Sequence, residues 1–305
     1  MSKKSLNKKM DKLLLLEQSG QLKASNQSRI IRKMKASPLA VAGILIFGII
    51  VILCAFAPLF TKFSATAIHL KDKLSAPNSV YILGTDQLGR DIWARILYGG
   101  RLSIIVGLGS ALGSALIGVS LGVYAGYKGG WLDSTILKFS EIFMAFPQIV
   151  LVLIIVAITK ASLLNLILIF VATGWPSMYR MTRSQILSIK EQEYVQALRA
   201  FGVNEFKICF KHMLPNAIGP IFVNITLSTA MFILQESALS FLGLGVPQEV
   251  ATWGNMLNIV NGRFDWLIEN PWIWLPVGIV LTLFILSINF IGDGLRDATD
   301  PTQIG

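Results

Sequence analysis

Residues 39–59 read LAVAGILIFGIIVILCAFAPL, a stretch without a single charged side chain. A helix needs about 20 apolar residues to cross the roughly 30 Å of hydrocarbon in a bilayer, so this stretch is long enough to span a membrane. Five further uncharged stretches follow, at residues 102–127, 142–159, 161–179, 213–235 and 271–292. One such run could be a buried helix of a soluble protein, but six in one chain predict an all-α, polytopic membrane protein with about six transmembrane helices.

The composition of the chain also predicts a lipid environment. Hydrophobic residues make up 53% of the chain and charged residues only 14%, with a mean hydropathy of +0.63. Soluble globular domains carry about 25% charged residues, so a chain this poor in charge cannot cover a water-facing surface. With 305 residues, the chain has room for one membrane domain at residues 39–305, preceded by a polar, basic tail at residues 1–38.

The positive charges predict the orientation of the chain. The net charge is +10, and Lys and Arg collect on the cytoplasmic segments of membrane proteins. Ten cations lie in the tail: Lys3, Lys4, Lys8, Lys9, Lys12, Lys23, Arg29, Arg32, Lys33 and Lys35. We therefore expect both termini in the cytoplasm and external loops at residues 61–101 and 241–270. Nucleic-acid binding is disfavoured, because no basic patch with interleaved aromatic residues occurs outside the tail.

The carboxylates avoid the centres of the six apolar stretches. Glu141, Glu236 and Asp293 lie at the ends of stretches, where we expect them to meet water. Ion-coupled carriers and ion channels usually place ionisable groups within the membrane. The sequence therefore disfavours an ATP-independent carrier or channel and predicts that any transport draws its energy from elsewhere.

The chain carries no motif for catalysis or for a cofactor. It lacks the phosphate-binding pattern G-x-x-x-x-G-K-[ST], and no nucleophile–base pair is evident. The histidines, His69 and His212, are far apart in the sequence. Cys54 and Cys209 have no metal-ligand spacing, and we interpret them as free thiols. We expect this chain to be no enzyme and to bind neither a metal nor a cofactor itself.

Glycine and proline residues predict how the helices pack and bend. Gly109 and Gly113 are four residues apart, and so are Gly118, Gly122 and Gly126. Small residues at that spacing let two helix backbones approach closely in lipid. Prolines that can kink or end a helix occur at Pro58, Pro147, Pro176, Pro215, Pro220 and Pro276.

The segment at residues 190–215 is a polar insert between two apolar stretches. Tyr194, Ala197, Leu198 and Phe201 recur at the spacing of one helix face and predict a short amphipathic helix with an apolar stripe. Gly202 follows at the position just past the helix end, where a left-handed backbone is common.

A second short helix is predicted to follow at once. Asn204 is suited to cap it, and Phe206, Cys209, Phe210, Met213 and Leu214 repeat the apolar spacing before Pro215 turns the chain toward the membrane. Two amphipathic helices outside the bilayer need a cover for their stripes. That cover is either the protein's own cytoplasmic surface and the lipid interface, or a groove on a partner protein.

The insert resembles the cytoplasmic coupling loop of the permeases of binding-protein-dependent ABC importers. The family pattern is Glu-Ala-Ala, three residues, Gly, nine residues, Ile, one residue, Leu-Pro. It falls on Gln196-Ala197-Leu198, Gly202, His212 and Leu214-Pro215. Ala197, Gly202 and the Leu-Pro pair match, whereas Gln196, Leu198 and His212 replace Glu, Ala and Ile.

Four further motifs are similar to those of the peptide/nickel subfamily, and specifically to the C-type subunits of oligopeptide and dipeptide permeases. They are GTDQLGRD at residues 84–91, ESALSFLGLG at 236–245, WGNML at 253–257, and GDGLRD at 292–297 followed by Asp300-Pro301. Together with the insert, they extend the resemblance over residues 37–301.

This resemblance implies a type I ABC importer permease fold in the cell membrane. It implies that the chain is the membrane-spanning subunit of an ATP-driven importer of oligopeptides or dipeptides. The partners would be a homologous second permease subunit, two cytosolic ATPase subunits that hold ATP and Mg, and an external peptide-binding protein. The same machinery importing nickel or another small solute is the alternative.

The resemblance also implies the residues that contact the ATPase subunits. They are Tyr194, Gln196, Ala197, Leu198, Phe201, Gly202, Leu214 and Pro215. Because Gln196 is neutral where the family pattern has Glu, we expect docking to depend on apolar burial, with Leu198 and Phe201 filling a groove on the ATPase.

Overall fold

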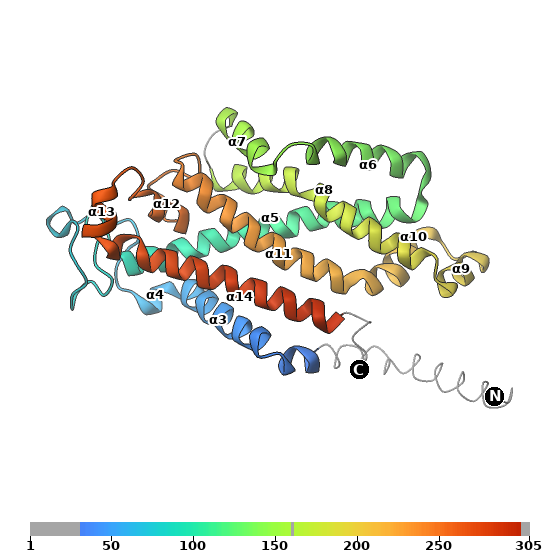
Figure 1. Ribbon diagram of the computed structural model, residues 1–305, viewed down its shortest axis with the longest axis horizontal. Helices are drawn as coiled ribbons and strands as arrows, with labels where there is room; N and C mark the ends of the chain where they lie inside the picture. Colours follow the sequence, from blue (N-terminus) through green and yellow to red (C-terminus); the bar gives the residue numbers. More distant parts are fainter. Residues whose placement is uncertain (1–30, 160–161, 300–305) are drawn as a thin grey trace.

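The computed structural model describes residues 31–159 and 162–299. Within these ranges the protein is an elongated bundle of helices, and the only β-type pairing is an isolated bridge between Thr85 and Asp91 (Figure 1). Five long helices run along the bundle: α3 (Pro38–Ala55), α5 (Ile92–Lys128), α8 (Leu163–Lys190), α11 (Leu214–Phe241) and α14 (Leu275–Thr299). Helix α5 packs along α8, and α3 packs along α14. The all-α fold is as predicted.

Four stretches of described helix are long and apolar enough to cross a membrane: Pro38–Ala55, Ile92–Lys128, Glu205–Phe241 and Pro271–Thr299. A fifth results if the bent pair α6 (Gly130–Met144) and α7 (Gln148–Ile158) is one span. Helix α8 is long enough to span a membrane, but its second half carries Arg180, Arg183 and Lys190. It is not one of these candidate spans. The count by length and composition is thus four or five, against the six apolar stretches of the sequence.

The apolar stretch predicted at residues 142–159 is not one continuous helix, because the chain bends by 80° between α6 and α7, close to Pro147, one of the prolines expected to kink or end a helix. Helix α6 ends at Met144, and Pro147 precedes the first residue of α7. A proline has no N–H to donate and its ring clashes with the preceding turn, which favours a break in the helix at this position. Helices α8 and α11, by contrast, continue through Pro176 and Pro220.

Helix α5 begins at Ile92, ahead of the expected start at residue 102, so the loop predicted at residues 61–101 is shorter than expected. Asp91 explains this start, because its side chain accepts a hydrogen bond of 2.6 Å from the backbone N–H of Ala94 and caps the helix. With 37 residues, α5 is about 55 Å long at 1.5 Å per residue and extends beyond the hydrocarbon.

The glycine spacing in α5 produces the expected close packing against α8. A Cβ atom added at Gly118 would lie 2.7 Å from the carbonyl oxygen of Trp175, and one at Gly122 would lie 2.9 Å from that of Tyr179. Gly126 is next along the same face and is less tightly enclosed, at 3.3 Å from Ile186. These glycines let the two backbones touch, which sets the position of α8.

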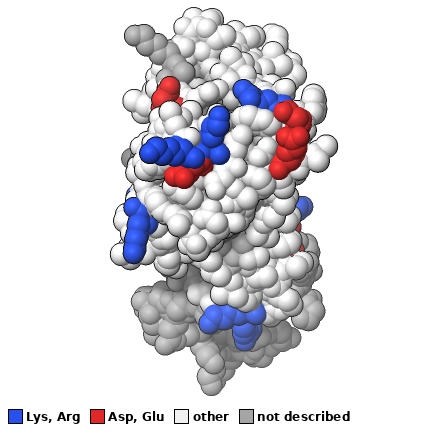
Figure 2. All heavy atoms as spheres, turned by 90° about the vertical axis from the view of Figure 1, so that its left-hand side faces the viewer, with Lys and Arg blue, Asp and Glu red and all other residues white. Residues whose placement is uncertain are grey.

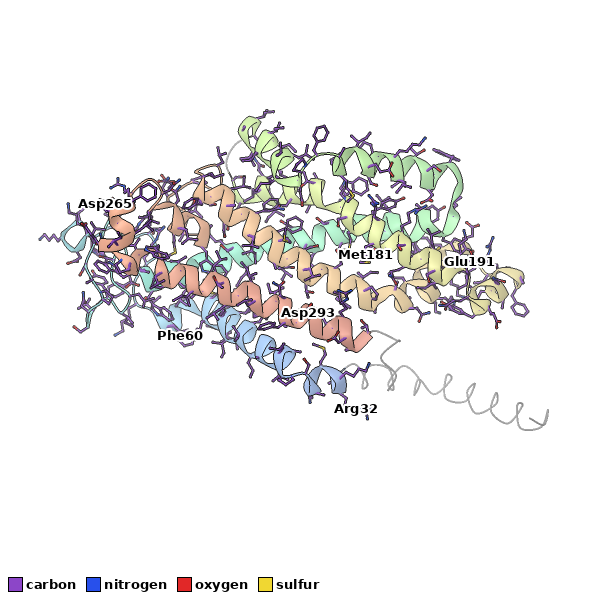
Figure 3. The ribbon with its side chains drawn as sticks, viewed as in Figure 1. Arg32, Phe60, Met181, Glu191, Asp265 and Asp293 are labelled. Carbon is purple, nitrogen blue, oxygen red and sulfur yellow. The ribbon has the colours of Figure 1, made fainter. Side chains whose placement is uncertain are left out.

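Five further short elements complete the end of the bundle that carries the 61–91 loop. They are α4 (Ala57–Phe60), α12 (Trp253–Asn258), α13 (Phe264–Glu269) and two 3₁₀ turns, at Leu70–Asp72 and Pro271–Ile273. At the opposite end lie α9 (Glu193–Ala200) and α10 (Glu205–Lys207) (Figure 1). Figure 3 shows the same separation, with Asp265 and Glu191 labelled at the two ends.

Candidate functional site

The insert at residues 190–215 forms a compact helical cap on one end of the bundle. Helix α9 ends at Ala200, and Gly202 takes a φ of +69°, as expected for a left-handed residue past a helix end. The side chain of Asn204 accepts a hydrogen bond of 2.9 Å from the N–H of Phe206, so it caps α10 as predicted. A π-helical turn, η2 (Ile208–Met213), then leads into α11.

The side chain that fixes α9 to the bundle is Val195, which the sequence analysis did not single out. It is fully buried with Ile208, Cys209 and Met213 in a core cluster. Leu198 is half-buried against the same cluster. The predicted stripe is therefore divided, since Leu198 packs partly inward while Phe201 remains 84% exposed.

The other predicted contact residues mostly lie on the outer surface of this cap. Tyr194, Gln196, Ala197, Gly202 and Pro215 are exposed, and Leu214 is half-buried. The structure thus brings the predicted set to one end of the bundle, where Phe201 is its most exposed large apolar side chain.

Polar contacts hold the exposed residues in place. The amide of Asn216 donates to the hydroxyl oxygen of Tyr194 at 2.8 Å and to the carbonyl oxygen of His212 at 3.1 Å. Gln196 donates to the carbonyl oxygen of Glu191 at 3.2 Å. Its amide is thereby engaged with the residue that follows α8, two positions before α9 begins.

Tyr127, at the end of α5, joins α5 to the cap and was missed from the sequence. The guanidinium of Arg199 lies 5.7 Å from the centre of its ring, and the ammonium of Lys190 lies 5.8 Å from it. Cations at this distance from an aromatic face are attracted to it. These contacts join α9 and the end of α8 to the end of α5.

A partly buried ion pair links α6 to α8 near the same end. Arg183 donates to both carboxylate oxygens of Asp133, with Nε–Oδ1 at 2.6 Å and Nη2–Oδ2 at 2.5 Å, and Tyr179 donates to Oδ1 at 3.1 Å. The bidentate geometry fixes both helices in orientation as well as distance. Nothing in the sequence pattern pairs these residues, because they lie in different helices.

At the opposite end, the GTDQLGRD motif at residues 84–91 anchors the loop from within. Asp86 is fully buried, accepts from Nε of Arg90 at 2.6 Å, and accepts from the backbone N–H groups of Leu88 and Arg90. Arg95 of α5 reaches the carbonyl oxygen of Ala65 at 3.1 Å. Burial raises the pKa of the Asp91 carboxyl, and the hydrogen bond from Ala94 opposes that shift.

Figure 2, which looks onto this end of the bundle, shows both cations and carboxylates on its surface.

Glu236 is placed differently from the expectation that it meets water. Its side chain is fully buried, accepting from Ser240 at 2.8 Å and from Ser103 at 3.4 Å. The backbone N–H of Trp253 donates to Ser103 at 3.2 Å. The prediction is wrong because α12 folds back over this position, so that Glu236 connects α11, α5 and α12. Glu141 and Asp293 are exposed, as expected.

Within the part of the chain that the structure describes, no three His, Cys, Asp or Glu residues lie close enough to hold a metal ion. Cys54 and Cys209 are buried free thiols.

The comparisons with known proteins agree with this geometry. Residues 118–304 match the model of the binding-protein-dependent transport system inner membrane component family, and residues 26–77 match that of the N-terminal TM domain of oligopeptide transport permease C. The dipeptide transport system permease protein DppC of Alkalihalophilus pseudofirmus is 39% identical over 270 residues, which cover 88% of each chain. The oligopeptide transport system permease protein OppC of Bacillus subtilis is 36% identical over 271 residues, which cover 88% of this chain and 87% of the relative.

A solved structure has the same fold. A chain of an inward-facing MetNI methionine ABC transporter superposes with a TM-score of 0.55 at 20% identity, covering 68% of this chain and 97% of the other. At this identity the likeness concerns the fold alone.

Proposed function

Because the chain belongs to the family of binding-protein-dependent transport system inner membrane components, we propose that it is the permease subunit of an ATP-driven importer of peptides. A member of this family is a transport subunit of a multi-pass membrane complex and not an enzyme, and ATP is hydrolysed by other subunits of that complex. The observation that supports a peptide as the substrate is the match over 88% of the chain to relatives named as dipeptide and oligopeptide permeases.

The importer that we propose has five components. This chain pairs with a homologous second permease subunit, two cytosolic ATPase subunits bind ATP and Mg, and an external binding protein delivers the peptide. Within the chain, residues 39–305 are the permease domain and residues 1–38 a cytoplasmic tail, of which residues 1–30 lie outside the described ranges. The alternative, transport of nickel, has no support from a metal-binding group in the described residues.

The surface that we propose for ATPase docking is the cap built from α9, α10 and η2. Its contact residues are Tyr194, Gln196, Ala197, Leu198, Phe201, Gly202, Leu214 and Pro215. The supporting observation is that Phe201 is 84% exposed at the tip of a segment otherwise fixed by Val195 and Tyr127. Phe206 of α10 also protrudes from this cap, at 62% exposure. A fixed segment with protruding apolar side chains is suited to enter a groove and to transmit its movement to α5.

The experiment that tests the function is reconstitution. The purified complex in proteoliposomes should take up labelled di- or oligopeptide only with ATP and the binding protein, and should take up no nickel. ATP-dependent nickel uptake without peptide uptake would replace the proposed substrate with the alternative.

Gly202→Val is expected to weaken docking without removing the protein from the membrane. An added Cβ meets no atom within 4 Å, so the cost comes from the φ of +69°, which disfavours L residues by about 1–2 kcal/mol. The end of α9 then shifts and Phe201 is misplaced. Peptide uptake and ATPase content of the purified complex measure the effect, and Gly202→Asn should retain both, since Asn tolerates this backbone region. Wild-type docking by Gly202→Val would contradict the coupling role.

The orientation that we propose places the cap in the cytoplasm and the 61–91 loop outside. The start of α3 and the end of α14 lie toward the end that carries α9, in agreement with cytoplasmic termini (Figure 1). Ser79 and Lys207 are exposed at opposite ends, and both natural cysteines are buried. Ser79→Cys should therefore react with an impermeant thiol reagent on intact cells, and Lys207→Cys only after permeabilisation. The reverse pattern would invert the topology.

A further inference from the structure

A groove of about 420 Å³ opens where the α6–α7 break meets α8 and α11. None of its twelve lining residues carries a charge, and five of them bear a side-chain amide or a hydroxyl: Gln148, Thr173, Ser177, Asn224 and Ser228. The groove therefore combines apolar surface with uncharged hydrogen-bonding groups.

A chain of hydrogen bonds continues behind this wall. Gln235 donates its amide to Oε1 of Gln148 at 3.3 Å, and Gln148 donates to the hydroxyl of Thr173 at 3.4 Å. The side-chain amide oxygen, Oε1, of the buried Gln235 has no hydrogen-bond partner in the described part of the chain. The three residues come from α11, α7 and α8, so the amides are held at a point where three helices meet.

The backbone at the break gives independent evidence that this side does not face lipid. Residues 145–147 join two helices bent by 80° and are exposed. Figure 1 shows this turn part-way along the bundle, away from both ends. Irregular backbone at membrane depth occurs only where it is buried in protein or lines a water-filled cavity, because lipid cannot satisfy its N–H and C=O groups. Amides and hydroxyls on a lipid-facing surface would carry a similar cost.

We propose that this groove is the wall that the subunit contributes to the translocation path, and that it binds the main chain of an extended peptide. This assignment rests on the proposed function and adds the site and the chemistry of recognition. Gln148 and Thr173 are already bonded to Gln235, to each other and to the carbonyl oxygen of Ile169, so they hold the wall in place. The amide of Asn224 and the hydroxyl of Ser228 line the groove and can both donate and accept hydrogen bonds, which matches the N–H and C=O groups that every peptide carries. Since the wall holds no charge, it does not select peptides by the charge of their side chains.

The first test measures water access in the assembled transporter in lipid nanodiscs. Asn224→Cys and Ser228→Cys should react with a charged methanethiosulfonate reagent. Ile279→Cys is the matched control and should not react: Ile279 is 50% exposed and belongs to α14, a helix that Figure 1 shows across the bundle from α6 and α7. Groove cysteines as unreactive as Ile279→Cys would overturn the assignment. This test does not depend on the substrate.

The second test measures recognition by uptake kinetics. Asn224→Leu should raise the KM for neutral, cationic and anionic peptides alike, by about tenfold for one lost main-chain contact, and Asn224→Gln should restore it. Asn224→Asp should favour cationic over anionic peptides by about tenfold, because a charge in a protein-lined path is weakly screened. Unchanged KM and unchanged charge preference would overturn the groove assignment, whereas a wild-type transporter that takes up no peptide would instead overturn the proposed substrate.

Discussion

Phe201→Ala is expected to reduce the yield of the complete complex and to uncouple ATP hydrolysis from peptide uptake. Phe201 is 84% exposed in the isolated subunit, so its removal costs the fold little. Burying a large apolar side chain stabilises an interface by roughly 1.5–3 kcal/mol, and truncating one at an interface centre costs about 2 kcal/mol or more. A loss of about 2 kcal/mol weakens docking roughly 30-fold. The measurements are the ATPase-to-permease ratio of the purified complex and its peptide-stimulated hydrolysis.

Phe264→Ala is the matched control for this experiment. Phe264 is 79% exposed on α13, at the opposite end of the bundle, so it should leave the ATPase ratio unchanged. Gln196→Glu should also change little, because an exposed polar contact contributes only about 0–1 kcal/mol. If Phe201→Ala assembles and couples normally while a change at Gln196 disrupts the complex, docking depends on a polar contact instead.

Gly122→Leu is expected to prevent correct folding of the subunit. Its Cβ would lie 2.8 Å from Cβ of Thr182 and 2.9 Å from the carbonyl oxygen of Tyr179. The carbonyl belongs to the backbone of α8 and cannot rotate away, so the helices must separate. Overpacking a well-filled core costs about 1–3 kcal/mol, and separation would also strain the Asp133–Arg183 pair that joins α6 to α8. We expect a lower melting temperature in detergent, little monodisperse protein and no uptake.

Gly48→Leu provides the comparison for helix propensity and bulk. Gly48 lies in α3, and an added Cβ there meets no atom within 4 Å. This variant should fold and melt like the wild type. A Gly122→Leu protein that melts at the wild-type temperature would show that α5 and α8 are not in contact at this position.

Local features of the sequence were sufficient for the fold class and for several details of the cap. Long uncharged runs specify membrane helices whatever surrounds them, because a charged group in lipid is costly. Gly202 and Asn204 adopt the predicted conformations since a left-handed residue and a helix cap depend on their immediate neighbours. Pro147 was noticed as a possible kink, but the 80° bend it accompanies was not expected.

The tertiary structure alone decided which face of each helix is covered. In α9, periodicity predicted an amphipathic helix but could not show that Val195 faces the bundle and that Phe201 remains exposed. Glu236 is buried only because α12 returns over it, which its place at the end of an apolar run did not indicate.

The groove likewise could not be read from the sequence. Gln148, Thr173 and Asn224 lie on three different helices, and each looks like an isolated polar residue in an apolar run. Periodicity is a property of one helix, whereas burial and pairing are properties of the surfaces that two helices share. The sequence by itself therefore determined that this chain is a helical membrane protein with a short helical insert at residues 190–215. Helix packing determined which residues face the core, the groove and the outer surface.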